Sequence, residues 1–227
     1  MDLDNLKQIT KLDKENMRDL LIAFPRQCED ALFIAEHTKV KNSYKRKYAN
    51  ILFAGLGGSA IGADVIKDCV AGESDTPIFV NRDYTLPGFV GENTLVFAVS
   101  YSGNTEETLS AYAEARRRGS KIAVITSGGK MKERAMKNND LLVVIPKGYP
   151  PRSALGYSFI PAMVMLSKLG VIKNKRGDIK SAIELLSAMQ YKKLGPHVAE
   201  KANIAKAVAR KAFKRFSVVY SSNACSS

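Results

Sequence analysis

The sequence predicts an α/β protein with a five-stranded parallel, doubly wound sheet of the flavodoxin-like type. Three observations lead to this prediction. Apolar runs of four or five residues recur along the chain, amphipathic segments separate most of them, and loops rich in glycine or hydroxyl side chains follow two of them. Buried parallel strands are continuous apolar runs, and their alternation with helices is typical of sheets covered on both faces.

The expected strands are short and apolar, and they lie at residues 51–54, 77–80, 95–99, 122–125 and 141–145. The helices expected between them lie at residues 59–71, 104–118 and 130–138, and residues 82–94 are expected to form mostly loop. If the strand order is 2-1-3-4-5, the loops after the first and third strands share one crevice at the carboxyl edge of the sheet, where such folds bind ligands.

Helices are also expected before and after the sheet. Residues 13–37 predict two helices, with Pro25 ending the first and opening the second, which would bury Cys28. Residues 38–48 are polar and basic and are expected to form a loop. These patterns divide the chain as follows: an N-terminal helical segment (1–48), an α/β domain (49–172), a helical linker (173–215) that is expected to be poorly anchored, and a further strand and turn (216–227).

The chain of 227 residues carries a net charge of +13, which raises the question of a polyanionic partner. Its basic residues fall mainly in 39–47 and 192–215, where the second run alternates with apolar residues at helical spacing. That spacing is typical of the solvated face of an amphipathic helix. Because no RNA-binding, helix-turn-helix or zinc-finger pattern accompanies the charge, we expect no nucleic-acid partner but a small phosphorylated substrate.

The sequence predicts no cofactor, metal or membrane partner. Cys28, Cys69 and Cys225 are odd in number and lack a CxxC spacing, which favours a reducing compartment, with Cys28 and Cys69 as core residues. His37 and His197 form no metal-ligand cluster. No apolar run approaches the ~20 residues of a membrane span, and the acidic N-terminus is unlike a secretory signal. A cytoplasmic location follows.

The loop at residues 100–105 is the main candidate site. It places hydroxyls at Ser100, Ser102 and Thr105, with Gly103 among them, where an expected strand passes into an expected helix. Backbone N–H groups and the positive end of the helix dipole meet at such a junction, which suits an anion, and hydroxyls add donors. The alternative is that these side chains only cap the helix.

A second loop of this kind follows the first expected strand. Gly55, Gly57 and Ala60 match G-x-G-x-x-A, a weak form of the dinucleotide fingerprint, so a nucleotide-binding α/β protein remains an alternative. A convincing acidic residue is lacking at the end of the second strand. Gly58 and Ser59 open the next helix, and Ser59 suits a sugar hydroxyl or a phosphate oxygen. Two such loops at one predicted crevice favour a phosphate ligand over capping.

A proline-marked loop at residues 146–157 leaves the fifth expected strand at the same edge. Arg152 supplies a permanent positive charge in this loop. Its planar guanidinium could stabilise an oxyanion that develops on a bound substrate. A surface arginine beside prolines is the equally weighted alternative. The segment 127–129, after the fourth strand, is expected to be a turn.

These motifs together resemble the sugar isomerase (SIS) domain family, and most closely its bifunctional phosphoglucose/phosphomannose isomerases. The resemblance covers nearly the whole chain. It is carried by Leu12-Asp13 through Asn16-Met17, Phe24-Pro25, Gln27-Cys28, Gly55-x-Gly57-Gly58-Ser59, Ser100 through Thr108, and Pro151-Arg152-x-Ala154-Leu155-Gly156-Tyr157.

The resemblance implies an aldose–ketose isomerase acting on a hexose 6-phosphate, with no cofactor, and a homodimer in the full-length form. It implies that Ser100, Ser102 and Thr105 hold the phosphate, that Gly58 and Ser59 contact the sugar, and that Arg152 stabilises an enediolate. Family members carry the catalytic glutamate, a ring-opening histidine and a lysine in or after a second SIS domain. Here residues 216–227 resemble only the start of that domain, so we expect impaired turnover; a non-catalytic SIS phosphosugar-binding module is the alternative.

Overall fold

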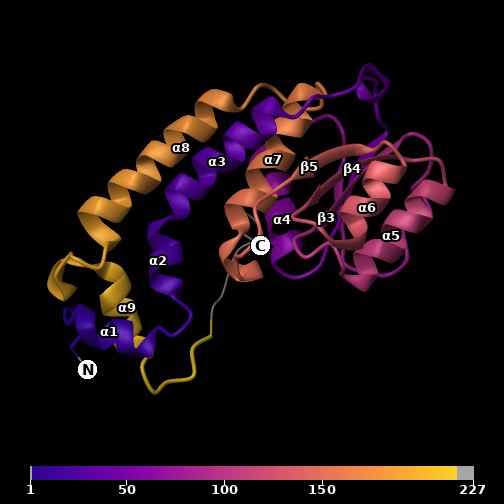
Figure 1. Ribbon diagram of the computed structural model, residues 1–227. Coiled ribbons are helices and arrows are strands. Elements are labelled where there is room, and N and C mark those ends of the chain that lie inside the picture. Colours follow the sequence, from indigo (N-terminus) through magenta and orange to yellow (C-terminus); the bar gives the residue numbers. More distant parts are fainter. Residues whose placement is uncertain (1, 219–227) are drawn as a thin grey trace.

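The computed structural model describes residues 2–218 and contains a five-stranded parallel sheet in the order β2-β1-β3-β4-β5 (Figure 1). Its strands are β1 (Asn50–Ala54), β2 (Ile78–Asn81), β3 (Thr94–Ser100), β4 (Lys121–Thr126) and β5 (Leu141–Val144). The predicted fold class, strand positions and strand order are confirmed.

Each face of the sheet builds a separate apolar core because neighbouring residues of a strand point to opposite faces. On one face, Phe53 of β1 and Phe97 of β3 stack with ring centroids 4.7 Å apart. On the other face, Leu52 and Val96 lie in the second core. Apolar residues are therefore needed at every position of these strands, which explains why the central strands read as unbroken apolar runs.

Helices cover both faces (Figure 1). The second face packs against α5 (Glu106–Arg117) and α6 (Gly129–Lys137), and the first packs against α3 (Phe24–His37), α4 (Gly58–Val70) and α7 (Leu155–Lys168). Three of these match the helices expected between the strands. Helix α7 is not predicted from the sequence, because it is apolar around most of its circumference and lacks an amphipathic period.

The segment before the sheet contains one helix more than expected. It holds α1 (Leu6–Leu12) and α2 (Met17–Ile22) ahead of α3, and Pro25 lies in the first turn of α3 as predicted. Residues 38–48 are less loop-like than expected, because they include a 3-10 turn (Asn42–Tyr44). The buried hydroxyl of Tyr44 donates to the Ile122 carbonyl at 2.7 Å and accepts from the Leu141 N–H at 2.8 Å. This tyrosine therefore joins β4 and β5.

The segment after α7 is better anchored than expected. Helix α8 (Arg176–Met189) buries Ile179 and Ile183 in the core of the first face, against α3. Residues 216–218 form no strand, and the rest of the further strand predicted from residue 216 lies outside the described residues, as does Cys225. Cys28 is buried as expected, but the core assignment of Cys69 is wrong: it is exposed, because α4 turns the neighbouring Val70 inward instead.

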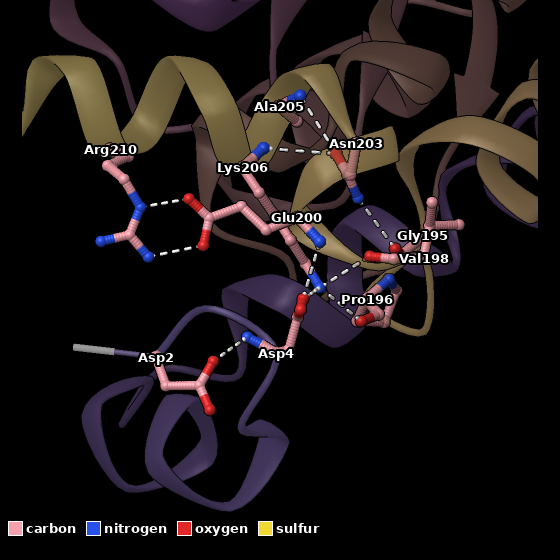
Figure 2. A network of polar contacts seen from close by, with 10 residues as sticks. All are labelled: Asp2, Asp4, Gly195, Pro196, Val198, Glu200, Asn203, Ala205, Lys206 and Arg210. Carbon is pink, nitrogen blue, oxygen red and sulfur yellow. Dashed lines mark hydrogen bonds and ion pairs between the residues drawn. The ribbon is translucent and has the colours of Figure 1, made fainter.

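A polar network joins the first residues of the chain to residues 195–210 (Figure 2). The ammonium group of Lys206, on α9 (Ile204–Ala212), contacts the Asp4 carboxylate and the Pro196 and Val198 carbonyls, each at 2.8 Å. Asp4 also accepts from the Glu200 N–H at 2.9 Å. This network holds α1 beside α9, away from the sheet (Figure 1).

Asn203 is the buried centre of the C-terminal part of this network, and Asn203→Ala is expected to lower the free energy of unfolding of this part by about 1–2 kcal/mol. Its carbonyl oxygen accepts from the Ala205 and Lys206 N–H groups, and its amide donates to the Gly195 carbonyl at 3.0 Å. Amide hydrogen exchange of α9 measures the loss. Asn203→Asp keeps the cap and should lose less; equal protection in the alanine variant and the wild type would contradict the assignment.

Across residues 2–218 no helix is both long and apolar enough to span a membrane.

Candidate functional site

Three loops meet at the carboxyl edge of the sheet, because parallel strands all end on the same side. They are residues 55–59 after β1, 100–105 after β3 and 146–154 after β5. All six residues predicted for the site, Gly58, Ser59, Ser100, Ser102, Thr105 and Arg152, lie on these loops or in the first helical turn that follows them. Their roles toward a ligand stay a prediction.

Ser59 joins the first two of these loops. Its hydroxyl, in the first turn of α4, accepts a hydrogen bond from the Tyr101 N–H at 3.3 Å. Since Ser102 is the next residue, this contact brings the glycine loop and the hydroxyl loop to one place. The two anion-suited loops therefore adjoin, as the strand order led us to expect.

The hydroxyl loop is braced from within. Ser100 is fully buried; its hydroxyl donates to the Thr105 hydroxyl at 3.0 Å and accepts from the Gly103 N–H at 3.1 Å. Ser102, which is exposed, accepts from the Asn104 N–H at 3.2 Å. Ser59, Ser102 and Thr105 thus accept hydrogen bonds from the protein and keep their own protons for a ligand, while Ser100 positions Thr105.

The N-terminus of α5 is not closed by its own cap residue. Thr105 occupies the N-cap position with extended backbone, but among the described residues its side chain makes no cap hydrogen bond to the first turn. A capping threonine would accept from an N–H of that turn. This geometry weighs against the alternative that the hydroxyls only cap the helix, and it leaves the dipole end and its amides to an anion.

Gly103 lets the hydroxyl loop pack tightly against the loop after β4. Its φ of +71° lies in the left-handed region, and a Cβ added there would come within 1.8 Å of the Gly128 carbonyl oxygen. The Met131 N–H donates to the Gly103 carbonyl at 2.9 Å. The 127–129 segment, expected only to be a turn, therefore also fixes the candidate phosphate loop.

A lysine that the sequence analysis did not consider lies beside this contact. A Cβ built at Gly128 would lie 3.0 Å from Nζ of Lys147, so the ammonium group approaches the loop that backs Gly103. A cation here adds to the positive potential of the α5 N-terminus.

The third loop touches the first through Gly58. A Cβ at Gly58 would lie 2.9 Å from the Pro151 carbonyl oxygen and 3.8 Å from the Arg152 N–H nitrogen. Only a residue without a side chain permits this approach without a shift. Gly58 thus lies next to both Ser59 and the turn that carries Arg152, so the first and third loops adjoin.

Tyr101 ties the third loop to the hydroxyl loop. Its phenol donates to the Pro146 carbonyl at 3.0 Å and accepts from the Tyr149 N–H at 2.9 Å. Burial raises the pKa of this phenol further above neutral pH, so both hydrogen bonds persist well into the alkaline range. No local pattern predicts this role of Tyr101, because its partners lie some 45 residues away in the chain.

Arg152 extends from a 3-10 turn (Pro151–Ser153), is largely exposed, and forms an ion pair with Glu15. The loop that carries Glu15 is fixed by Asp13, whose carboxylate accepts from the Met17 and Arg18 N–H groups, each at 2.8 Å. The N-terminal helices therefore reach the candidate site. Glu15 was missed because no local pattern links residues so far apart.

Residues 44–172 match the SIS domain model, so the chain belongs to the SIS domain family. The chain is 42% identical over 196 residues to a bifunctional phosphoglucose/phosphomannose isomerase of Caldicellulosiruptor bescii, covering 86% of this chain and 57% of that protein. It is 44% identical over 147 residues to a protein of the same name from Aquifex aeolicus, covering 64% and 45%. The chain thus spans about half the length of these curated relatives.

Among solved structures, the tagatose-6-phosphate ketose/aldose isomerase of Escherichia coli superposes with a TM-score of 0.55 at 15% identity, covering 75% of this chain and 52% of that one. At this identity the likeness shows the shared fold. The SIS domain match favours that family over the dinucleotide-binding alternative, which depended on the first glycine loop alone.

Proposed function

We propose that this chain forms the sugar-phosphate-binding part of an aldose–ketose isomerase that interconverts glucose 6-phosphate or mannose 6-phosphate with fructose 6-phosphate. The hydrogen bond from the Tyr101 N–H to the Ser59 hydroxyl supports this most directly, because it joins the two loops that suit a phosphate. The names of the bacterial relatives support the reaction class. A cytoplasmic location and a homodimeric full-length form belong to the same proposal.

In this proposal the phosphate lies at the N-terminus of α5. Ser59, Ser102 and Thr105 donate their hydroxyl protons to its oxygens, and the amides of the first helical turn donate from below. Ser100 acts through Thr105, which it holds by the hydrogen bond described above. Such a cradle binds the end of the sugar that does not react, and so fixes the position of C1 and C2.

The reacting end of the sugar is proposed to lie toward Arg152. Isomerisation moves a proton between C1 and C2 through an enediolate, whose oxygen carries negative charge. A guanidinium placed at that oxygen stabilises the intermediate more than the neutral substrate, which is what lowers the barrier. A substrate oxygen would share Arg152 with Glu15 or replace that carboxylate.

We assign no general base among residues 2–218. The Glu106 and Glu107 carboxylates lie in the first turn of α5, where negative charge stabilises the helix dipole. We therefore propose that this chain by itself binds hexose 6-phosphates and isomerises them weakly. A non-catalytic phosphosugar-binding module would bind the same ligands, and turnover distinguishes the two.

Calorimetric titration with fructose 6-phosphate tests the proposal. Thr105→Val keeps the shape of the side chain and removes its donor, so the dissociation constant is expected to rise roughly tenfold or more, the loss typical of a hydrogen bond to a charged group. Thr38→Val, whose hydroxyl bonds the Ile34 carbonyl after α3, is the matched control and should bind as the wild type does.

Two results would contradict the proposal. Failure of the wild type to bind fructose 6-phosphate would remove the phosphate site, and equal loss in the two threonine variants would remove Thr105 from it. Production of glucose 6-phosphate from fructose 6-phosphate, measured with a coupled dehydrogenase, would assign the chain to the isomerases and not to the binding modules. Turnover equal to that of a full-length relative would overturn the expectation of weak activity.

A further inference from the structure

Gln27 is a buried polar residue that the proposed function does not use. It lies in the second turn of α3 and is 2% exposed. Its side-chain amide donates to the Ser153 carbonyl at 2.8 Å, and its carbonyl oxygen accepts from the Gly156 N–H at 2.9 Å. These partners lie more than 120 residues away and flank the start of α7.

The two hydrogen bonds close the turn that carries Arg152. Ser153 is the last residue of the 3-10 turn and follows Arg152 directly, and Gly156 is the second residue of α7. The N-cap residue of α7 is Ala154, which cannot cap with its side chain. Gln27 therefore supplies, from another helix, both an acceptor for the buried N-terminus of α7 and a donor for the turn.

The fit between Gln27 and this turn is tight. A Cβ added at Gly156 would lie 2.8 Å from the Gln27 carbonyl oxygen and 3.2 Å from Sγ of Cys28. A buried side chain of this length that both donates and accepts is required, since any apolar replacement would leave two buried backbone groups unpaired. The conformation of the Arg152 turn thus depends on α3.

We infer that Gln27 is the positioning residue for Arg152. It holds the turn so that the guanidinium faces the reacting end of the sugar, and it acts on substrate only through Arg152. The inference rests on the proposed function, because it presumes that Arg152 meets an oxyanion of a bound sugar phosphate.

A pair of probe ligands separates the two ends of the site. Glucitol 6-phosphate and 6-phosphogluconate share the phosphate, but the second carries a carboxylate at C1, where the first has a neutral hydroxyl. The ratio of their dissociation constants therefore reports Arg152, while the phosphate cradle contributes equally to both. The wild type is expected to prefer 6-phosphogluconate by roughly tenfold, the size of one charge-assisted hydrogen bond.

Gln27→Met removes both hydrogen bonds at similar side-chain length. Its preference for 6-phosphogluconate is expected to fall to that of Arg152→Met, with the affinity for glucitol 6-phosphate nearly unchanged. The double variant should show no further loss, because one residue acts through the other. Tyr157→Phe is the matched control: it removes a second bond between α3 and α7, from the Tyr157 phenol to Asp30 at 2.8 Å, and leaves both Gln27 hydrogen bonds in place.

The outcomes are distinct. If Gln27→Met is less stable but keeps the wild-type preference for 6-phosphogluconate, Gln27 is only a structural residue. That result overturns the inference. Equal wild-type affinity for the two probes also overturns it, while the phosphate site stands. Binding of neither probe removes the proposed function itself. If Gln27→Met does not fold, Gly156→Ala, which forces the same amide out of place, gives the same readout.

Discussion

Replacing Gly103 with alanine is expected to destabilise the protein by about 3 kcal/mol and to abolish binding of fructose 6-phosphate. Roughly 1–2 kcal/mol comes from a side chain in the left-handed region, and a further ~1–3 kcal/mol comes from the shift needed to clear the Gly128 carbonyl. The added Cβ would otherwise lie 1.8 Å from that oxygen. Any such shift displaces the loop between Ser102 and Thr105, which carries the proposed phosphate ligands.

Chemical denaturation and calorimetric titration measure the two losses. Gly170→Ala is the matched control, since Gly170 has a φ of +72° but a Cβ there would meet no atom within 4 Å. The Gly170→Ala variant should therefore lose only the roughly 1–2 kcal/mol that a side chain in the left-handed region costs. It should bind fructose 6-phosphate as the wild type does. A Gly103→Ala variant as stable as the control, or one that binds fructose 6-phosphate as the wild type does, would contradict the packing described for this loop.

Raising the pH from 10 to about 12 is expected to remove roughly 4 kcal/mol of stability, which is a large part of the free energy of unfolding of a typical domain. Burial raises the pKa of Tyr44 to about 12. Burial and the Asp140 carboxylate, 2.5 Å away, raise that of Tyr112 to about 12. Each phenol stays neutral in the folded chain and ionises near pH 10 when unfolded.

The sign follows from this difference. A phenol whose pKa is raised by folding stabilises the folded state fully at pH values below its unfolded pKa of 10.0. This stabilisation is lost as the pH rises toward the pKa of the folded state. Each tyrosine accounts for roughly 2 kcal/mol between pH 10 and pH 12. Denaturation at several pH values, with tyrosinate absorbance as the second probe, measures the slope.

Tyr44→Phe provides the control for the alkaline effect. It should be less stable than the wild type at neutral pH, because the Ile122 carbonyl and the Leu141 N–H lose their partner. It should nevertheless lose less stability between pH 10 and pH 12, since one titrating group is gone. A wild type whose stability does not change over this interval, or a folded protein whose tyrosines all ionise near pH 10, would refute the prediction.

The strands could be predicted because a strand that is buried on both faces of the sheet consists of consecutive apolar residues. In β3, all positions from Thr94 to Ser100 are buried, so the run has no competing interpretation. Helix α5 was predicted because one face is charged and the other packs on the sheet. Helix α7 has no such contrast, since it lies between α3, α4 and the sheet, and its apolar sequence resembles other buried segments.

Some residues of the candidate site are likewise predicted by local sequence patterns, and others are not. The hydroxyls of residues 100–105 and the glycines of residues 55–58 are local signals, and a strand order of 2-1-3-4-5 predicts that their loops meet. Gln27, Glu15 and Tyr101 lie in stretches that carry the family resemblance, but no local pattern predicted a role for any of them. Each acts through a partner distant in the chain, and a single buried glutamine or exposed glutamate has no pattern of its own.

The sequence by itself determined that this protein has a doubly wound sheet, two anion-suited loops at one edge and an arginine near them, because periodicity and turn chemistry are properties of neighbouring residues. Only the tertiary structure decided that Ser100 supports Thr105 from a buried position, and that Gln27 holds the turn of Arg152. Hydrogen bonds between distant segments depend on where whole helices come to rest. That placement results from the packing of both cores together, and no short stretch of the chain encodes it.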